Sequence, residues 1–271
     1  MILRIIINFA VLSFLVLFGQ VFANGGALLP SSQQKTHHFF ITLGTGYSKS
    51  KTTDLKVDTS FWDPAIQGYN DDMGSSELYT VGAGVQVNNF LTIALDATRR
   101  PDYQYSKFQT PSGPQPVGFI GTKTRKFDFD NTSIMLNALV YGAGFPHHRL
   151  DWSTQNVLIQ PFVGVGIGVA YNTVSDFHSV SDSTVQGAKQ VFSVANSHTI
   201  SQFAWQLLAG LNMTLHKRFL VDMGYRYFDG GNFESNNYVY QVQGLNSGLV
   251  VPPWKGKFRT NEAFVNFSYL I

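Results

Sequence analysis

The sequence has no cysteine and few charged residues. The absence of Cys among its 271 residues excludes disulfides, thiolate metal sites and cysteine nucleophiles. Charged residues make up 13% of the chain, about half of the roughly 25% that is typical of soluble domains. The formal net charge of +2 gives no reason to expect nucleic acid as a partner.

Long apolar runs are missing from the chain beyond its first residues. Arg4 precedes the apolar run 5–18, and Val21-Phe22-Ala23 then fits a cleavage site. A membrane-spanning helix needs about 20 apolar residues, so we expect 1–23 to be a cleaved signal peptide, with an uncleaved anchor as the alternative. No later run is long enough for a spanning helix, so any membrane insertion must use strands.

The sequence does contain repeated two-residue alternation, 25 glycines and 14% aromatic residues. Alternation of apolar with small or polar residues predicts strands that are buried or lipid-facing on one side only. Eight such runs follow one another, at residues 39–47, 79–87, 91–97, 132–141, 162–171, 203–214, 219–228 and 261–271.

The lengths of these runs and of their connections indicate a membrane barrel. Most runs reach about 9–12 residues, which suits a tilted strand that crosses a bilayer, whereas soluble strands average about 5–6. Short turns alternate with polar connections of about 25–30 residues, as in outer-membrane barrels. We predict an all-β fold, a closed antiparallel eight-stranded transmembrane β-barrel at 37–271 with four long extracellular loops, after a periplasmic segment at 24–36. The segment 142–160 is too long for a bare turn, and a short helix or strand extensions both fit it.

Two stretches resemble small OmpA-type and opacity-type outer-membrane barrels. Residues 160–170, QPFVGVGIGVA, are similar to a Pro-aromatic-Val-Gly-x-Gly-x-Gly strand of that family, and residues 221–231, VDMGYRYFDGG, to its penultimate strand. The resemblance implies location in the bacterial outer membrane and assembly by the barrel-assembly machinery. The chain departs from the family at Ile271, where members usually end in Phe or Trp.

Polar residues on the inward face of the predicted strands form one candidate site. Asp222 and Arg226 are four residues apart on one face, and Glu262 lies on the next strand. We predict that Arg226 bridges these two carboxylates as part of a structural network, because barrel interiors are ordinarily polar. The predicted network comprises Asp96, Gln206, Asp222, Arg226 and Glu262.

Aromatic residues at the strand ends predict two rings at the membrane interfaces. Their members include Phe39, Tyr47, Tyr79, Phe90, Tyr141, Tyr171, Phe203, Phe219, Tyr227 and Tyr269. Arg99 and Arg100 follow the third run, and both are candidates to contact lipopolysaccharide phosphates. Alternatively, both arginines are solvated charges at the rim of the barrel. For the aromatic residues, the alternative to the membrane interpretation is core packing in a soluble barrel of the lipocalin kind.

Histidines suggest two further kinds of chemistry. His37-His38 and His147-His148 invite a metal interpretation, but neighbours in a strand point to opposite faces. His178 and His198 lie in a Ser-rich stretch, yet no local sequence places a nucleophile beside a base. We therefore expect no metal, no cofactor and no catalytic residue.

The predicted function is that of an integral surface barrel, which supports the envelope and offers its loops for adhesion or recognition. Outer-membrane lipid and lipopolysaccharide are the expected surroundings, and host or surface ligands the expected loop partners. Two alternatives stay open: a narrow channel for small solutes, and a lipid A-modifying enzyme.

Overall fold

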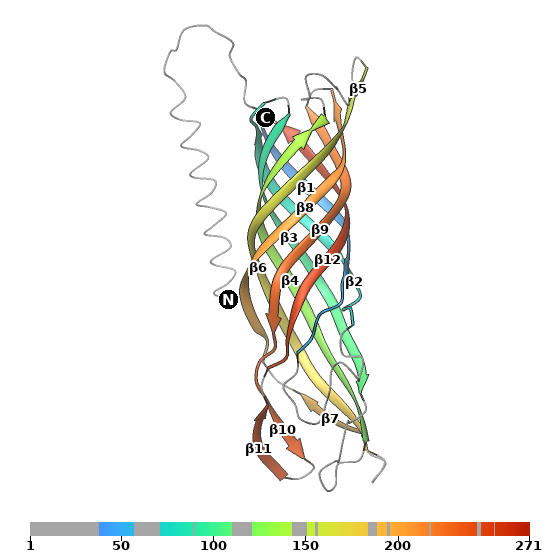
Figure 1. Cartoon of the computed structure of the whole chain (residues 1–271), viewed down its shortest axis with the longest axis vertical. Helices are drawn as coiled ribbons and strands as arrows, with labels where there is room; N and C mark the ends of the chain where they lie inside the picture. Colours follow the sequence, from blue (N-terminus) through green and yellow to red (C-terminus); the bar gives the residue numbers. More distant parts are fainter. Residues whose placement is uncertain are drawn as a thin grey trace, which may run out of the picture. The chain divides into compact units, whose positions relative to one another are not determined.

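The strands of the protein are described by a computed structural model (Figure 1). It describes residues 38–56, 71–88, 90–109, 121–142, 151–154, 157–183, 189–193, 196–216, 218–242, 245–251 and 253–271. The predicted signal peptide and the predicted segment 24–36 lie outside these residues. Among the described residues, none belongs to a helix long and apolar enough to cross a membrane. The strands are β1 (His38–Ser50), β2 (Ser75–Gln86), β3 (Leu91–Gln109), β4 (Gly121–Tyr141), β5 (Trp152–Ser153), β6 (Val157–Ser183), β7 (Lys189–Ser193), β8 (His198–Leu215), β9 (Phe219–Glu234), β10 (Tyr238–Val242), β11 (Leu245–Val251) and β12 (Lys255–Leu270).

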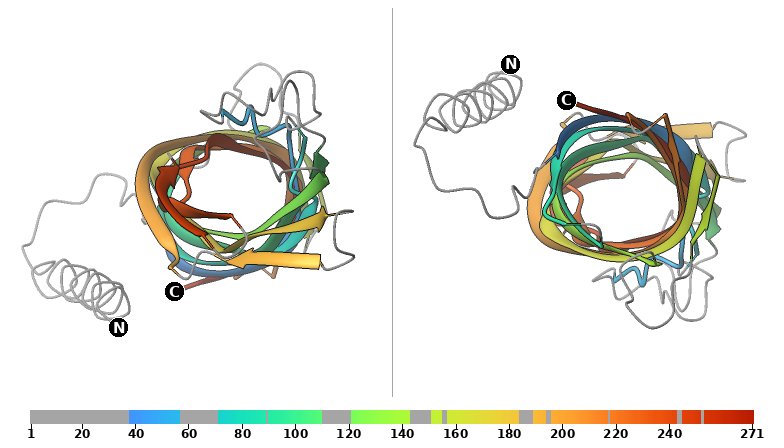
Figure 2. Two further views of the ribbon diagram at one scale, coloured as in Figure 1. Left: turned by 90° about the horizontal axis from the view of Figure 1, so that it is seen from below. Right: turned by 90° about the horizontal axis from the view of Figure 1, so that it is seen from above.

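Eight of these strands form a closed antiparallel barrel. Around the wall, β1 is followed by β2, β3, β4, β6, β8, β9 and β12, and β12 pairs with β1 again. Figure 2 shows the ring along the barrel axis. Closure gives every wall strand two neighbours in the membrane part, so the sheet has no open edge in the bilayer. The predicted eight-stranded fold is confirmed.

Several wall strands are longer than a bilayer requires. β3, β4 and β6 contain 19, 21 and 27 residues, whereas about 9–11 tilted residues cross the hydrocarbon. The barrel therefore continues past the bilayer at the end opposite the C-terminus (Figure 1). We call this part the extension; it comprises residues 101–109 of β3, 121–130 of β4, 173–183 of β6, 229–234 of β9 and 255–260 of β12.

The extension shortens three of the predicted loops, most of all the loop between β3 and β4. β3 and β4 stay paired as far as Gln109 and Lys123, so only residues 110–120 connect them. The expected loop of about 25–30 residues is therefore wrong at this position. Its polar residues belong to strands because, beyond the bilayer, the outer face of a barrel is wet and need not be apolar.

β-Bulges change which residues point inward at the start of the extension. Pairing of β3 with β4 shifts between Arg100 and Tyr103, and Asp102 there has a φ of 60°. Arg100 and Tyr103 are three positions apart, yet both are buried. Before the bulge the even-numbered residues of β3 point inward, and after the extra residue the odd-numbered ones do. Tyr103 and Tyr105 therefore point into the barrel.

An aromatic core fills the extension. Tyr103 packs edge-on against Phe258 with ring centroids 5.3 Å apart, and Tyr105 stacks on Phe127 at 4.7 Å. Such pairs add about 0.5–1.5 kcal/mol each beyond burial. This core contains the rings of Tyr103, Tyr105, Phe127, Phe129, Phe177, Phe228, Phe233, Trp254 and Phe258.

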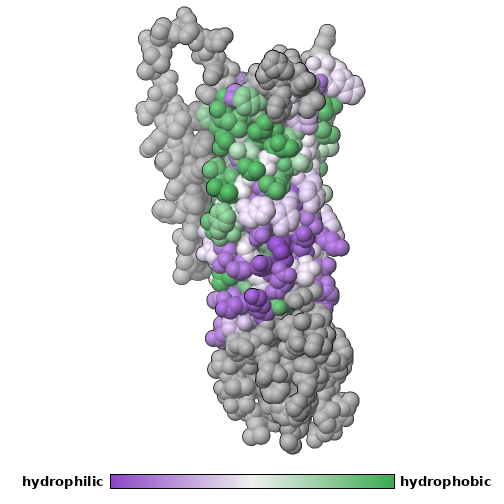
Figure 3. All heavy atoms as spheres, viewed as in Figure 1, coloured by the Kyte–Doolittle hydropathy of each residue, from purple (hydrophilic) through white to green (hydrophobic). Residues whose placement is uncertain are grey.

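The outer wall of the remaining barrel is apolar. Figure 3 shows this surface near the C-terminal end and a hydrophilic surface over the extension. Such a belt is insoluble in water and suits hydrocarbon. Exposed members include Ile41, Leu43, Val81, Leu136, Val163, Val165, Ile167, Leu207, Leu211, Met223 and Phe267.

Aromatic residues at the ends of the belt lie mostly where the sequence predicts them. Tyr47, Tyr79, Phe203 and Phe219 are exposed on the outer wall. Tyr141 is the exception: it is buried inside the barrel, with its ring centroid 5.9 Å from that of Phe162. The prediction for Tyr141 is wrong because it shares the inward face of β4 with Asn137 and Met135.

Tight connections join strands at the C-terminal end. Asn88 Oδ1 accepts hydrogen bonds from the main-chain N–H groups of Phe90 and Leu91 and so closes the turn between β2 and β3. Within the segment 142–160, Trp152 and Ser153 form β5 and pair with the start of β6. The sequence allowed either a short helix or strand extensions in this segment. In its described part, the structure shows strand extensions.

Candidate functional site

A buried ion cluster occupies the barrel interior where the extension begins. Glu262 on β12 receives Arg100 of β3, with Nε 2.5 Å from Oε1 and Nη2 3.2 Å from Oε2. Arg226 of β9 donates from its Nε to Oε2 of Glu262 at 2.5 Å. Glu262 and Arg226 face each other directly across the β12–β9 ladder. All three side chains are at most 2% exposed.

Neighbouring hydroxyls and an amide add further hydrogen bonds to this cluster. Ser48 and Thr260 donate to Oε1 of Glu262 at 2.8 and 2.6 Å. Arg100 Nη1 donates to Asn131 Oδ1 and Ser133 Oγ, both at 2.9 Å. Buried charges are tolerated when they are paired and hydrogen-bonded. All three charges of this cluster are paired, and among the described residues only Nη2 of Arg226 lacks a hydrogen-bond partner in it.

A second polar group lies on the membrane side of the cluster. Gln206 donates to Asn137 at 2.6 Å, and Asn137 donates to Asp96 at 2.7 Å. A third group forms where Asn212 donates to Asp222 at 2.7 Å. The structure thus places all five residues of the predicted network inside the barrel, in three groups rather than one.

The predicted bridge through Arg226 forms only on one side. Arg226 binds Glu262, but Asp222 is held by Asn212. Residues four apart in a strand are separated by about 13 Å along its axis, whereas residues paired across a ladder are in direct contact. The third member of the ion cluster is Arg100, which the sequence argument placed elsewhere.

Arg100 does not face lipopolysaccharide, so the prediction for this residue is wrong. Its side chain is 0% exposed and lies 3.8 Å from the ring centroid of Phe228. Even-numbered residues of β3 up to Arg100 point inward, so Arg99 and Arg100 cannot share a surface. Arg99 is exposed on the outer wall, opposite Tyr79 on β2 and Thr132 on β4.

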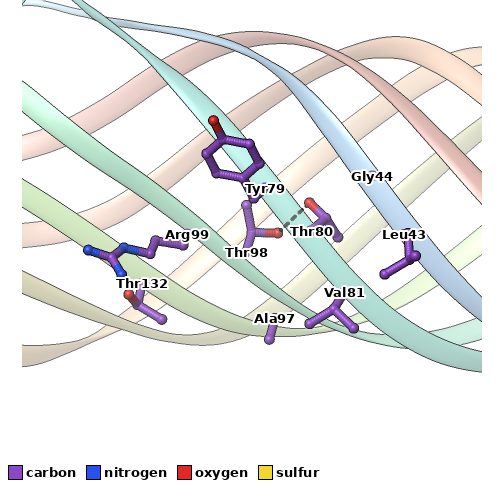
Figure 4. A pocket seen from close by; sticks show the side chains of 9 residues that line it. All are labelled: Leu43, Gly44, Tyr79, Thr80, Val81, Ala97, Thr98, Arg99 and Thr132. Atoms are coloured by element: carbon purple, nitrogen blue, oxygen red, sulfur yellow. Dashed lines mark hydrogen bonds between the residues drawn. The ribbon is translucent and has the colours of Figure 1, made fainter. Parts of the chain in front are cut away.

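Arg99 borders a groove on the outer wall of β1 to β4. The groove has a volume of about 440 Å³. Figure 4 shows Ala97 between larger neighbours, with Tyr79 and Arg99 at one end and Leu43 and Val81 at the other. Its lining consists of Leu43, Gly44, Tyr79, Thr80, Val81, Ala97, Thr98, Arg99 and Thr132.

The histidines do not come together among the described residues. His38 is exposed at the start of β1, and His178 Nδ1 lies 2.8 Å from the main-chain oxygen of Asp176. His37, His147 and His148 lie outside the described residues. Within the described part of the chain, no group of three or more potential metal ligands occurs.

Sequence reasoning missed the aromatic core, although a signal for it is present. Tyr103-x-Tyr105 and Phe127-x-Phe129 alternate with polar residues just beyond the predicted strand ends. These dyads have an apolar inside and a polar outside, the reverse of the membrane pattern. A search that accepts either sign of alternation would have extended β3 and β4.

Comparisons with known proteins agree with this architecture. The profile of the outer membrane protein beta-barrel domain matches residues 9–251. Neisserial surface protein A, NspA, is 16% identical over 87% of this chain and 99% of its own, with a TM-score of 0.44. The N-terminal β-barrel domain of Pseudomonas aeruginosa OprF is 10% identical over 84% and 97%, with a TM-score of 0.33. The Escherichia coli outer membrane protease OmpT is 8% identical over 89% and 100%, with a TM-score of 0.37. No curated protein sequence matches the chain.

The profile match spans most of the chain and so decides the family. The predicted family and the predicted location in the bacterial outer membrane are both confirmed. The chain belongs to the outer membrane protein β-barrel domain family and is a surface β-barrel of the bacterial outer membrane.

Proposed function

We propose that the protein is a closed surface barrel that recognises a partner outside the cell through its loops and the outer wall of its extension. The observation that carries this proposal is the filled interior. An interior packed with side chains leaves the outside of the molecule as the surface available for function. We infer that recognition proceeds without catalytic chemistry or cofactor, because the polar side chains of the interior bind one another.

The packing of the membrane part supports a closed barrel. Tyr141 and Phe162 are buried near the C-terminal end, and the ion cluster of Arg100, Arg226 and Glu262 lies further along the axis. Beyond it follows the aromatic core. An eight-stranded barrel is just wide enough for its own side chains, so this filling opposes the narrow-channel alternative.

Charged residues on the outer wall of the extension, and on and after β1 beside it, support recognition. Lys49, Lys51 and Lys257 are exposed on β1 and β12 and in the residues that follow β1. Arg259 is held by Asp54, which lies in the connection between β1 and β2. Charged side chains on a rigid wall suit a partner in water, and they raise the rate of encounter with a partner of opposite charge.

Conductance separates the proposal from the channel alternative. Purified, folded protein in planar bilayers should give no unitary currents, and Arg100→Ala should not open a path because the aromatic core still closes the extension. Regular unitary currents from the unaltered protein would contradict a closed barrel.

Adhesion of expressing cells tests recognition itself. Replacing 238–251, the β10–β11 segment, by a short Gly-Ser linker should lower binding to host cells or matrix and leave the heat-modifiable mobility of the barrel unchanged. Lys49→Gln with Lys257→Gln tests the wall in the same assay. If expressing cells bind no better than cells with an empty vector, the recognition proposal fails.

A further inference from the structure

The groove around Ala97 differs from the rest of the apolar belt. The large side chains of Leu43, Val81 and Tyr79 stand out from the wall and are 68%, 57% and 51% exposed. Ala97, directly opposite Val81 in the ladder, is small and leaves a gap on β3 beside these side chains. The result is a furrow of about 440 Å³ with apolar sides (Figure 4), within the roughly 300–1,000 Å³ of ordinary ligand sites.

A cation closes one end of this furrow. Arg99 is exposed in the row formed by Tyr79, Arg99 and Thr132. Within the described part of the chain, Arg99 has no ion pair. The nearest outward carboxylates on β2 and β4 have other partners: Glu77 accepts from Tyr79, and Asp130 accepts from the main chain of Asp102.

The position of Arg99 along the axis fixes which leaflet it meets. Arg99 stands at the boundary between the apolar belt and the extension, and the extension lies on the side of the longer connections. In outer-membrane barrels that side is extracellular. Arg99 is therefore level with the headgroups of the outer leaflet, while Leu43, Val81 and Ala97 are level with its acyl chains.

We propose that this groove binds one phosphorylated lipid of the outer leaflet, the lipid A part of lipopolysaccharide. An acyl chain lies over Ala97 alongside Val81, with Leu43 beyond it, and a phosphate binds the guanidinium of Arg99. Arginine suits this role because its planar fork binds phosphate through two parallel hydrogen bonds. A second copy of the chain fits less well, since a two-fold contact would place the same face, with its cation, against itself.

Native mass spectrometry of the purified, detergent-solubilised protein tests the proposal without any variant. The probes are bis-phosphorylated lipid A, dephosphorylated lipid A, phosphatidylethanolamine and inorganic phosphate. We expect one lipid A per barrel, with weaker binding once the phosphates are removed and none of inorganic phosphate alone. Equal binding of phosphorylated and dephosphorylated lipid A would overturn the role of Arg99.

Two variants with matched controls locate the site. Arg99→Gln should weaken lipid A binding about fivefold, the effect of one basic side chain near a charged headgroup. Ala97→Trp should fill the furrow and abolish the single tight site. Lys49→Gln removes another exposed cation, and Ala209→Trp adds the same ring to another exposed position of the wall on β8; both should bind like the unaltered protein.

The variants are compared only after each shows the mobility shift of a folded barrel. If Arg99→Gln and Ala97→Trp bind lipid A like their controls, the proposal is wrong. A dimer that forms without lipid and is lost in Ala97→Trp would assign the groove to a second copy and would equally overturn it. Neither result bears on recognition through the loops, which adhesion tests separately.

Discussion

The membrane part and the extension of the barrel are built from the same strands with opposite chemistry. On β12, the outward residues change from Lys257 in the extension to Val265 and Phe267 in the belt. The inward residues change in the other sense, from Phe258 to Glu262. Each part thus places its apolar side where water is absent: outside in the bilayer, and inside above it. The surroundings of the wall therefore decide which face of a strand is apolar, whereas the two-residue alternation itself decides that the segment is a strand.

The largest predicted effect concerns the ion cluster between the two parts. Glu262→Ala leaves Arg100 and Arg226 buried without their carboxylate, and we expect it to cost about 3–5 kcal/mol of unfolding free energy. Denaturant titration of folding into lipid vesicles measures this value. A triple variant, Arg100→Met with Arg226→Met and Glu262→Leu, should regain most of the loss. A loss below 1 kcal/mol in Glu262→Ala would show that the guanidinium groups are hydrated rather than buried.

The aromatic core should be nearly as important to the extension. Phe129 is 0% exposed and contacts Phe258 and Phe233, with ring centroids 4.6 and 5.3 Å away. Phe129→Ala should cost about 3–5 kcal/mol, or should loosen the extension alone. Hydrogen exchange of β3 and β4 distinguishes these outcomes. Lys126→Ala, on the exposed outer face of the same strand, is the control and should have little effect. Equal effects of both variants would contradict the inward core.

Outward charges should be harmful in only one of the two parts. Val165→Arg places a guanidinium in the apolar belt and should destabilise the barrel by about 2–4 kcal/mol if the site is near the bilayer midplane. Thr199→Arg, on the exposed wall beside the extension, should change stability by less than about 0.5 kcal/mol. The same vesicle titration compares them. Equal tolerance of both arginines would mean that the belt does not face lipid.

The smallest predicted effect is a pH dependence within the extension. Partial burial, together with the carboxylate of Asp176, raises the pKa of Asp128. The pKa of an aspartate in the unfolded chain is about 3.9. A carboxyl whose pKa is higher than this in the folded protein destabilises the fold at neutral pH. This destabilisation decreases as the pH falls through the folded pKa. Asp128→Asn should therefore add up to about 0.5 kcal/mol at pH 7. The gain should vanish below about pH 3.9, and a gain that is independent of pH would contradict this cause.

The sequence predicted the belt strands well because both faces of each strand carry a clear signal. In β6, Val163, Val165 and Ile167 alternate with glycines, and no bulge interrupts the pairing of these residues with β8. The extension was missed because its apolar residues point inward and because bulges, such as that at Asp102, break the two-residue period.

The candidate site shows the same division. Asp96, Gln206, Asp222, Arg226 and Glu262 follow from strand parity alone, and the structure places all of them inside the barrel. The partner of Glu262 does not follow from parity, because β3 and β12 are far apart in sequence and their side chains meet only across the closed barrel. Arg99 and Arg100 are neighbours in the sequence, yet one side chain lies outside the barrel wall and the other inside it.

Cysteine scanning tests the inversion between the two parts most directly, since the chain has no native cysteine. Lys257, Phe258 and Val265 of β12 are replaced one at a time by cysteine. Each variant is then treated with a water-soluble maleimide in intact outer membranes. We expect rapid labelling at 257 and protection at both 258 and 265. The aromatic core protects 258, and lipid protects 265. Rapid labelling at 258 or at 265 would contradict it.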